Sequence, residues 1–196
     1  MMPYSGPASY APIFWGTFLL WMILELIASR TKRSGDRSHA RDQGSYGLIV
    51  ILLFVGLTLD FTLSARLPQA AILWRRSWVF FSGIGLILAG VAFRWWAIAA
   101  LGKFFTFDVA VQFSQKVVDS GPYRYIRHPS YTGALMTQVG IGLALGNWAG
   151  LIALLGCMAI AYSYRISVEE KALVAALGEP YKQYMQRTRR IIPFLL

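Results

Sequence analysis

The chain has 196 residues, of which 56% are hydrophobic, 15% are aromatic and only 14% are charged. This charged fraction lies well below the roughly 25% of ordinary globular proteins, which excludes a soluble globular protein and indicates an integral membrane protein. The net charge of +10 does not indicate a nucleic-acid partner. The basic residues are grouped in particular loops, and no basic stripe with stacking aromatic residues lies outside the apolar runs.

Five apolar runs follow one another along the chain, and each is expected to form a membrane-spanning helix. The runs cover about residues 11–29, 46–65, 78–101, 130–145 and 148–164. Only Gly146 and Asn147 separate the fourth run from the fifth, so these two helices should form a tight antiparallel hairpin. The sequence therefore predicts an all-α integral membrane protein with five transmembrane helices and a helical C-terminal tail.

The distribution of basic residues predicts how the chain is oriented. One side of the membrane would carry Arg30, Lys32, Arg33, Arg37, Arg41, Lys103, Lys116, Arg124, Arg127, Arg165, Lys171, Lys182, Arg187, Arg189 and Arg190. The other side would keep Arg66, Arg75 and Arg76. Because lysine and arginine are enriched in cytoplasmic loops, we expect the N-terminus outside, the C-terminus in the cytosol, and the loop 102–128 on the cytosolic face with the tail.

Three ionisable residues lie within the apolar runs. Glu25 and Arg94 both fall toward the cytosolic ends of their helices. They could form an ion pair, or Arg94 could instead extend its charge to the membrane surface. Asp60 lies nearer the outer end of its helix, and the sequence indicates no role for it.

Glycine and cysteine indicate helix packing rather than cofactor binding. Two groups, Gly83-x-Gly85 with Gly90 and Gly140-x-Gly142 with Gly146, loosely resemble nucleotide-binding loops, but neither follows a predicted strand or opens a helix from a loop. Small residues of this kind more commonly allow close packing between helices. Cys157 is alone in an apolar run, so we expect neither a disulfide framework nor a metal site.

The segment from Gly121 to Gly133 gathers histidine, arginine and several tyrosines directly before the fourth apolar run. Charges close to hydrocarbon cost roughly several kcal/mol, so packing alone explains this cluster poorly. Pro129 is suited to the first turn of a helix and would leave His128 outside that helix, free to point at a ligand. This segment is therefore a candidate functional site.

The tail after the fifth run contains further start and stop signals for helices. Ser167, followed three residues later by Glu170, matches a capping box that would begin a separate helix. In this interpretation Glu170 only caps a helix. Gly178 would end that helix and Pro180 would begin another.

The predicted hairpin brings the two polar segments together, because the chain that leaves it returns to where it entered. The residues expected at one pocket on the membrane surface are His128, Tyr131, Arg165, Glu169 and Glu170. Carboxylates hold ammonium and hydroxyl groups, and aromatic faces attract cations. Such a pocket suits a ligand that carries an amine, hydroxyl groups, a ring and a positive centre.

These residues carry a resemblance to a known family. The pattern consists of Gly121-Pro122-Tyr123, Arg127-His128-Pro129-Ser130-Tyr131, Gly133, Arg165, Glu169-Glu170, Leu177-Gly178, Tyr181, Tyr184 and Ile192-Pro193. It resembles the isoprenylcysteine carboxyl methyltransferases, a family of membrane enzymes related to the phospholipid N-methyltransferases. The resemblance covers about residues 101–196, and residues 1–101 match only in being hydrophobic.

The resemblance implies a membrane-embedded methyltransferase that uses S-adenosylmethionine, with a cytosolic cofactor pocket and a lipid-facing entrance for a lipophilic or lipidated substrate. Residues 102–196 would form the catalytic region and residues 1–101 the first three spans, within one structural domain. By position, the residues that would line the cofactor pocket are Tyr123, His128, Tyr131 and Glu170, and Arg127 would support them. The methyl acceptor would face Arg165 and Glu169. Two further residues, Tyr181 and Tyr184, would pack in the tail.

The identity of the acceptor stays open at this point. A carboxylate such as that of an isoprenylcysteine needs no general base, and Arg165 could orient it through hydrogen bonds. An amine or a thiol would need His128 or Glu169 as a base. Two other functions also fit parts of the pattern: a nicotinamide-dependent membrane reductase of the sterol reductase type, and a non-catalytic membrane scaffold.

Overall fold

The computed structural model describes residues 10–31, 44–105 and 116–191, and its regular structure is helical. The α-helices are α1 (Ala11–Thr31), α2 (Ser45–Arg66), α3 (Arg76–Leu101), α4 (Pro129–Leu145), α5 (Trp148–Leu177) and α6 (Glu179–Arg187). Within these ranges there is no sheet, only two isolated β-bridges, so the predicted all-α class is confirmed. Lys32, Arg33, Arg37, Arg41, Ile192 and Pro193 lie outside the described residues.

Four of these helices are long and apolar enough to cross a membrane, namely α1, α2, α3 and α5. Helix α4 has 17 residues and falls just short of that length. Large apolar side chains face outward, for example Leu19 at 55% exposed, Phe54 at 73% and Ile152 at 66%. Side chains of this kind are stable on the outside only where lipid surrounds them. The chain is therefore a multi-pass membrane protein.

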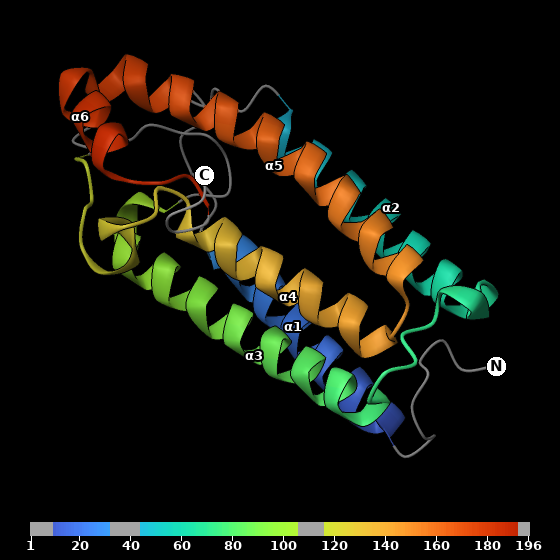
Figure 1. Cartoon of the computed structure of the whole chain (residues 1–196). Coiled ribbons are helices and arrows are strands. Elements are labelled where there is room, and N and C mark those ends of the chain that lie inside the picture. The colour runs from blue at the N-terminus through green and yellow to red at the C-terminus, as the bar shows by residue number, and fades with distance from the viewer. Residues whose placement is uncertain (1–9, 32–43, 106–115, 192–196) are drawn as a thin grey trace.

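The helices pair along their lengths (Figure 1). Helix α3 packs along α4, α1 lies against α3, and α2 packs along α5. Helices α4 and α5 meet at their connecting turn and lie further apart toward the end of the bundle that carries α6.

The α4–α5 hairpin is confirmed, and its turn shows why it is tight. Gly146 ends α4 with φ of 71°, a left-handed conformation that glycine adopts without strain. Asn147 then begins α5, because its side-chain oxygen accepts hydrogen bonds from the backbone N–H groups of Ala149 (3.0 Å) and Gly150 (3.2 Å). Two residues thus end one helix and start the next.

One expectation for the tail is wrong. No separate helix begins at Ser167, because α5 runs without interruption from Trp148 to Leu177. The Ser167/Glu170 pattern matches a capping box in spacing only, and no glycine or proline between residues 157 and 177 stops the preceding helix. Gly178 ends α5 with φ of 63°, and Pro180 lies in the first turn of α6 as predicted.

Close contact between the backbones of α3 and α4 depends on glycine, as predicted for Gly83, Gly90 and Gly140. A Cβ atom at Gly90 would lie 2.6 Å from the carbonyl oxygen of Gly133, and one at Gly140 would lie 2.6 Å from that of Gly83. Any larger residue at these positions would push the two helices apart. The prediction is wrong for Gly85, because among the described residues no atom beyond its chain neighbours and its own helix backbone lies within 4 Å of its Cβ position.

We expect Gly90→Ala to destabilise the protein by about 1–3 kcal/mol, because the added methyl group meets backbone atoms that cannot rotate away. The matched control is Gly85→Ala on the same helix, which should leave the thermal unfolding temperature in detergent unchanged or slightly higher. Equal melting temperatures for the two variants would contradict the glycine-dependent contact.

Candidate active site

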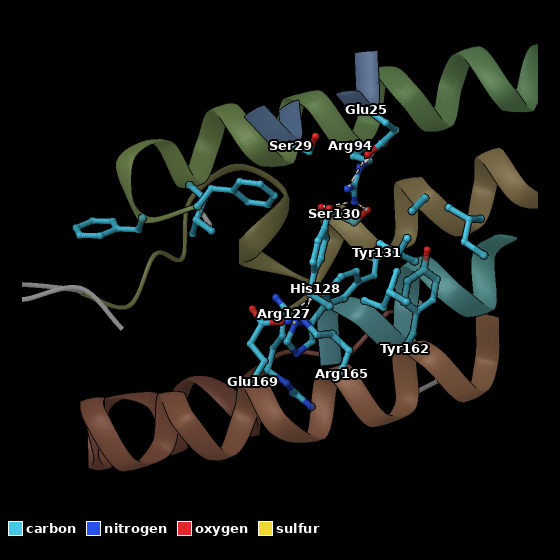
Figure 2. Close-up of a pocket in the computed structure, with 18 of the residues that line it drawn as sticks. Glu25, Ser29, Arg94, Arg127, His128, Ser130, Tyr131, Tyr162, Arg165 and Glu169 are labelled. Carbon is cyan, nitrogen blue, oxygen red and sulfur yellow. Dashed lines mark hydrogen bonds and ion pairs between the residues drawn. The ribbon is translucent and has the colours of Figure 1, made fainter. Parts of the chain in front are cut away.

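A cavity of ≈ 660 Å³ lies among the helices and is lined by residues of all six. Six of the seven predicted site residues line it, and five of them gather in one view (Figure 2). The six are Tyr123, Arg127, His128, Tyr131, Arg165 and Glu169. The structure thus brings these six predicted residues together, at what we call the polar end of the cavity.

Pro129 places His128 at the edge of this polar end. The proline begins α4, and His128 is the residue immediately outside the helix, with φ of −123° and ψ of 57°. The carbonyl oxygen of His128 accepts hydrogen bonds from the N–H groups of Tyr131 (3.0 Å) and Thr132 (3.2 Å). The imidazole ring stacks on the Tyr131 ring with centroids 5.6 Å apart. The predicted role of Pro129 in starting the helix is confirmed.

Tyr131 connects the two halves of the predicted site. Its hydroxyl donates to Glu169 Oε2 at 2.8 Å and accepts from Arg165 Nε at 3.0 Å. Arg165 Nη1 also donates to Ser45 Oγ at 2.8 Å. Arg165 is only 3% exposed, so its guanidinium is held in place by partners on α4 and α2. Sequence reasoning missed Ser45, because nothing near it in the chain indicates which helix α2 contacts.

Glu170 lies behind the cavity lining. Its carboxylate is buried and accepts hydrogen bonds from Arg127 Nε at 2.9 Å and from Arg190 Nη2 at 3.0 Å. His128 Nε2 lies 3.4 Å from the same carboxylate. Glu170 therefore holds cavity-lining residues in position from outside the lining.

The segment before α4 and the tail after α6 are joined by backbone hydrogen bonds. The N–H group of Arg127 donates to the carbonyl of Arg189 at 2.7 Å, and that of Arg189 donates to the carbonyl of Tyr125 at 3.0 Å. Arg127 Nη1 also donates to the carbonyls of Met185 and Thr188. These bonds fix the tail against the polar end of the cavity.

Helix α6 closes this end of the bundle with two buried tyrosines. Tyr181 and Tyr184 are 4% and 3% exposed, and the Tyr184 hydroxyl donates to the carbonyl of Tyr123 at 2.7 Å. Burial raises the pKa of Tyr184 above its ordinary value, so its hydroxyl keeps the proton that it donates. The predicted packing of both tyrosines in the tail is confirmed.

Arg94 forms the predicted ion pair with Glu25. Arg94 Nε lies 2.6 Å from Glu25 Oε1, and Arg94 Nη2 donates to Oε2 at 3.0 Å. Arg94 Nη1 donates to the hydroxyl of Ser130 at 2.8 Å and to its carbonyl at 3.1 Å. The three side chains form a continuous series in Figure 2. They link α1 and α3 to the first turn of α4, two residues after His128.

The other end of the cavity is apolar and lies between α1 and α2. Leu19 and Met22 of α1 and Val50 and Phe54 of α2 line it. All four side chains are also substantially exposed on the outside of the bundle. An apolar chain could therefore lie between α1 and α2 while its polar end reaches the residues around Tyr131.

The chemistry of the polar end favours an organic ligand with several functional groups. Guanidinium, carboxylate, imidazole and phenol groups converge there, and they suit a ligand with carboxylate, ammonium and hydroxyl groups. Among the described residues, no three His, Cys, Asp or Glu side chains are placed to hold a metal ion.

The chain is similar in sequence to proteins of known function. Residues 83–175 match the isoprenylcysteine carboxyl methyltransferase (ICMT) family. The match covers just under half of the chain, so this region is similar to that family. It is 32% identical to protein-S-isoprenylcysteine O-methyltransferase B of Arabidopsis thaliana over 120 residues, which is 60% of this chain and 61% of that protein. It is 31% identical to the Schizosaccharomyces pombe protein-S-isoprenylcysteine O-methyltransferase, over 58% of this chain and 49% of that protein.

A solved structure has a similar fold. It is described as the eukaryotic intramembrane Ras methyltransferase ICMT, and it matches with a TM-score of 0.56 and 26% identity. The match covers 74% of this chain and 52% of that one. The chain thus spans less than two thirds of the length of the ICMT relatives described here.

We expect the Glu25–Arg94 ion pair to show strong coupling in a double-mutant cycle. Glu25→Ala and Arg94→Ala should each cost about 3–5 kcal/mol of stability, since each leaves a largely buried charge without its partner. The double variant should cost clearly less than the sum of the two. Thermal unfolding in detergent measures the coupling.

The exposed Arg187–Asp119 pair provides the matched control for this cycle. Its side chains are 62% and 54% exposed, so its coupling should be no more than about 1 kcal/mol. Additive losses at Glu25 and Arg94 would show that the two residues do not stabilise one another.

Proposed function

We propose that this protein is a membrane methyltransferase that transfers a methyl group from S-adenosylmethionine to a lipophilic acceptor carrying a carboxylate, such as an isoprenylcysteine. One observation carries the proposal. A single cavity joins the polar end around Tyr131 and Arg165 to the apolar space between α1 and α2. The match of residues 83–175 to the ICMT family supports it.

The polar end fits the cofactor. S-adenosylmethionine, when bound, supplies a methyl group on a positively charged sulfur, and it also carries an ammonium, a carboxylate, hydroxyl groups and a ring. Tyr123, His128 and Tyr131 would line its pocket, with aromatic faces that favour a positive centre. Burial raises the pKa of Tyr123, so its hydroxyl stays neutral. Arg127 and Glu170 would hold these groups in place.

Arg165 and Glu169 would act on the acceptor. The Arg165 guanidinium, fixed by Tyr131 and Ser45, can attract and orient an acceptor carboxylate. A carboxylate is already a nucleophile at neutral pH, so alignment and the exclusion of water are the main requirements. Glu169 accepts the Tyr131 hydroxyl and keeps that ring in place beside the guanidinium.

The proposed topology has five spans, with the N-terminus outside and the C-terminus in the cytosol. Helix α4 would be the additional span, since 17 residues rise about 25 Å, close to the thickness of the hydrocarbon core. Tyr181 and Tyr184 of α6 line the cavity, so its polar end lies at the end of the bundle that carries this helix. In this topology the active site faces the cytosol.

Purified protein should transfer labelled methyl groups from S-adenosylmethionine to N-acetyl-S-farnesylcysteine, and not to phosphatidylethanolamine. It should bind S-adenosylmethionine but not reduced nicotinamide nucleotides. Methylation of phosphatidylethanolamine alone would favour an amine acceptor. Binding of the nicotinamide nucleotide would favour a reductase, and binding of neither cofactor would favour a scaffold.

In the same assay, Arg165→Ala should lower turnover by at least about 100-fold, because the acceptor loses its orienting cation. Its affinity for S-adenosylmethionine should stay near the wild-type value. The matched control is Arg187→Ala, which removes an exposed arginine outside the cavity and should leave turnover unchanged. A large loss of cofactor affinity in Arg165→Ala would instead place Arg165 in the cofactor site.

A further inference from the structure

The inner part of the cavity contains a second pair of polar groups, at a distance from the proposed reaction site. Gln138 of α4 and Tyr162 of α5 both line the cavity, and Gln138 Nε2 lies 2.9 Å from the Tyr162 hydroxyl. The two residues are only 2% and 4% exposed. Tyr162 reaches from α5 toward α4 in Figure 2. Leu53 and Leu57 of α2 also line the cavity, as do the paired charges of Arg94 and Glu25.

The position of the pair is fixed by the hairpin. Gln138 lies seven residues after Tyr131 on α4, and Tyr162 lies seven residues before Glu169 on α5. Seven residues are about two helical turns. Gln138 therefore lies on the same face of α4 as Tyr131, and Tyr162 lies on the same face of α5 as Glu169, with a rise of about 10 Å along each helix. The Tyr131 and Tyr162 rings stack between them, with centroids 5.2 Å apart. The two contacts thus form two levels along one cavity.

The hydrogen bonds of the pair are incomplete. Within the described part of the chain, Gln138 Oε1 is buried and has no partner. With the amide in this orientation, the pair presents an unused acceptor at Gln138 and the hydroxyl hydrogen of Tyr162. With the amide turned round, the Tyr162 hydroxyl donates to Gln138 Oε1, and the pair presents an amide hydrogen and a lone pair of Tyr162. Either orientation leaves at least one donor and one acceptor, which together match a hydroxyl group.

We propose that Gln138 and Tyr162 bind a hydroxyl group on the lipophilic part of the acceptor, about 10 Å from the methyl-accepting end. This inference rests on the proposed function, in which the cavity holds a lipophilic acceptor. A chain made only of hydrocarbon would leave the Gln138 oxygen unpaired or retain water beside it, and would bind less tightly. The pair therefore sets a preference for hydroxylated over plain hydrocarbon chains.

Two matched probes test this preference: N-acetyl-S-dodecylcysteine and its derivative with a hydroxyl on carbon 5 of the dodecyl chain, eight bonds from the carboxyl carbon. Eight bonds of an extended chain span about 10 Å at roughly 1.2 Å per bond. We expect the wild-type protein in detergent to bind the hydroxylated probe about tenfold more tightly in equilibrium binding. In Gln138→Leu and in the more conservative Tyr162→Phe, the ratio of the two dissociation constants should fall to about one.

The matched control is Thr137→Val, which removes a neighbouring buried hydroxyl that bonds within α4 to the Gly133 carbonyl and does not line the cavity. The Thr137→Val variant should keep the tenfold ratio of the two dissociation constants. Equal wild-type affinities, or a preference that survives in Gln138→Leu, would overturn the proposal.

Methyl transfer to the same probes separates this inference from the proposed function. A hydroxyl preference in binding without methyl transfer would support the hydroxyl site and contradict the methyltransferase. Methyl transfer to both probes with equal KM values would support the methyltransferase and contradict the hydroxyl site.

Discussion

A carboxylate removed from water must be paired, and Glu170 imposes this constraint on the polar end of the protein. It is 5% exposed on α5, and its oxygens are held by Arg127 and Arg190 with His128 nearby. Two of these partners precede α4, and the third follows α6. Glu170 therefore determines where three segments that are distant in the sequence meet. Loss of either arginine would leave part of a buried charge unpaired and loosen the wall of the cavity.

A second constraint acts within the membrane. Glycines bring α3 and α4 into backbone contact, and α2 packs along α5, but α4 and α5 separate after their turn. The Arg94–Glu25 pair and its bonds to Ser130 then fix α1 and α3 to the first turn of α4. These contacts leave a cavity whose polar end is held by hydrogen bonds and ion pairs and whose apolar end is bounded by exposed side chains of α1 and α2. A reaction between a polar cofactor and a lipid-like acceptor needs both ends in one space.

Much of this arrangement follows from local sequence signals. Length and composition determine the helices, Gly146 and Asn147 determine the hairpin, and the hairpin brings His128 close to Glu169. The Glu25–Arg94 pair was also within reach of sequence reasoning, because two opposite charges at similar depth in hydrocarbon are more stable together. These predictions depend only on spacing and depth along the chain.

The features that sequence reasoning missed depend on how helices are rotated and paired. The contact of Ser45 with Arg165 and the Gln138–Tyr162 pair join helices whose neighbours cannot be read from a linear pattern. The capping-box error at Ser167 has a related cause, since the same spacing occurs inside a helix that nothing interrupts.

The central claim, that one cavity joins the cofactor site to the space between α1 and α2, is tested most directly by photo-crosslinking. A methyl acceptor with a photoreactive alkyl chain should label residues 19–26 and 49–57 in the presence of S-adenosylmethionine, and labelling confined to other helices would contradict the claim.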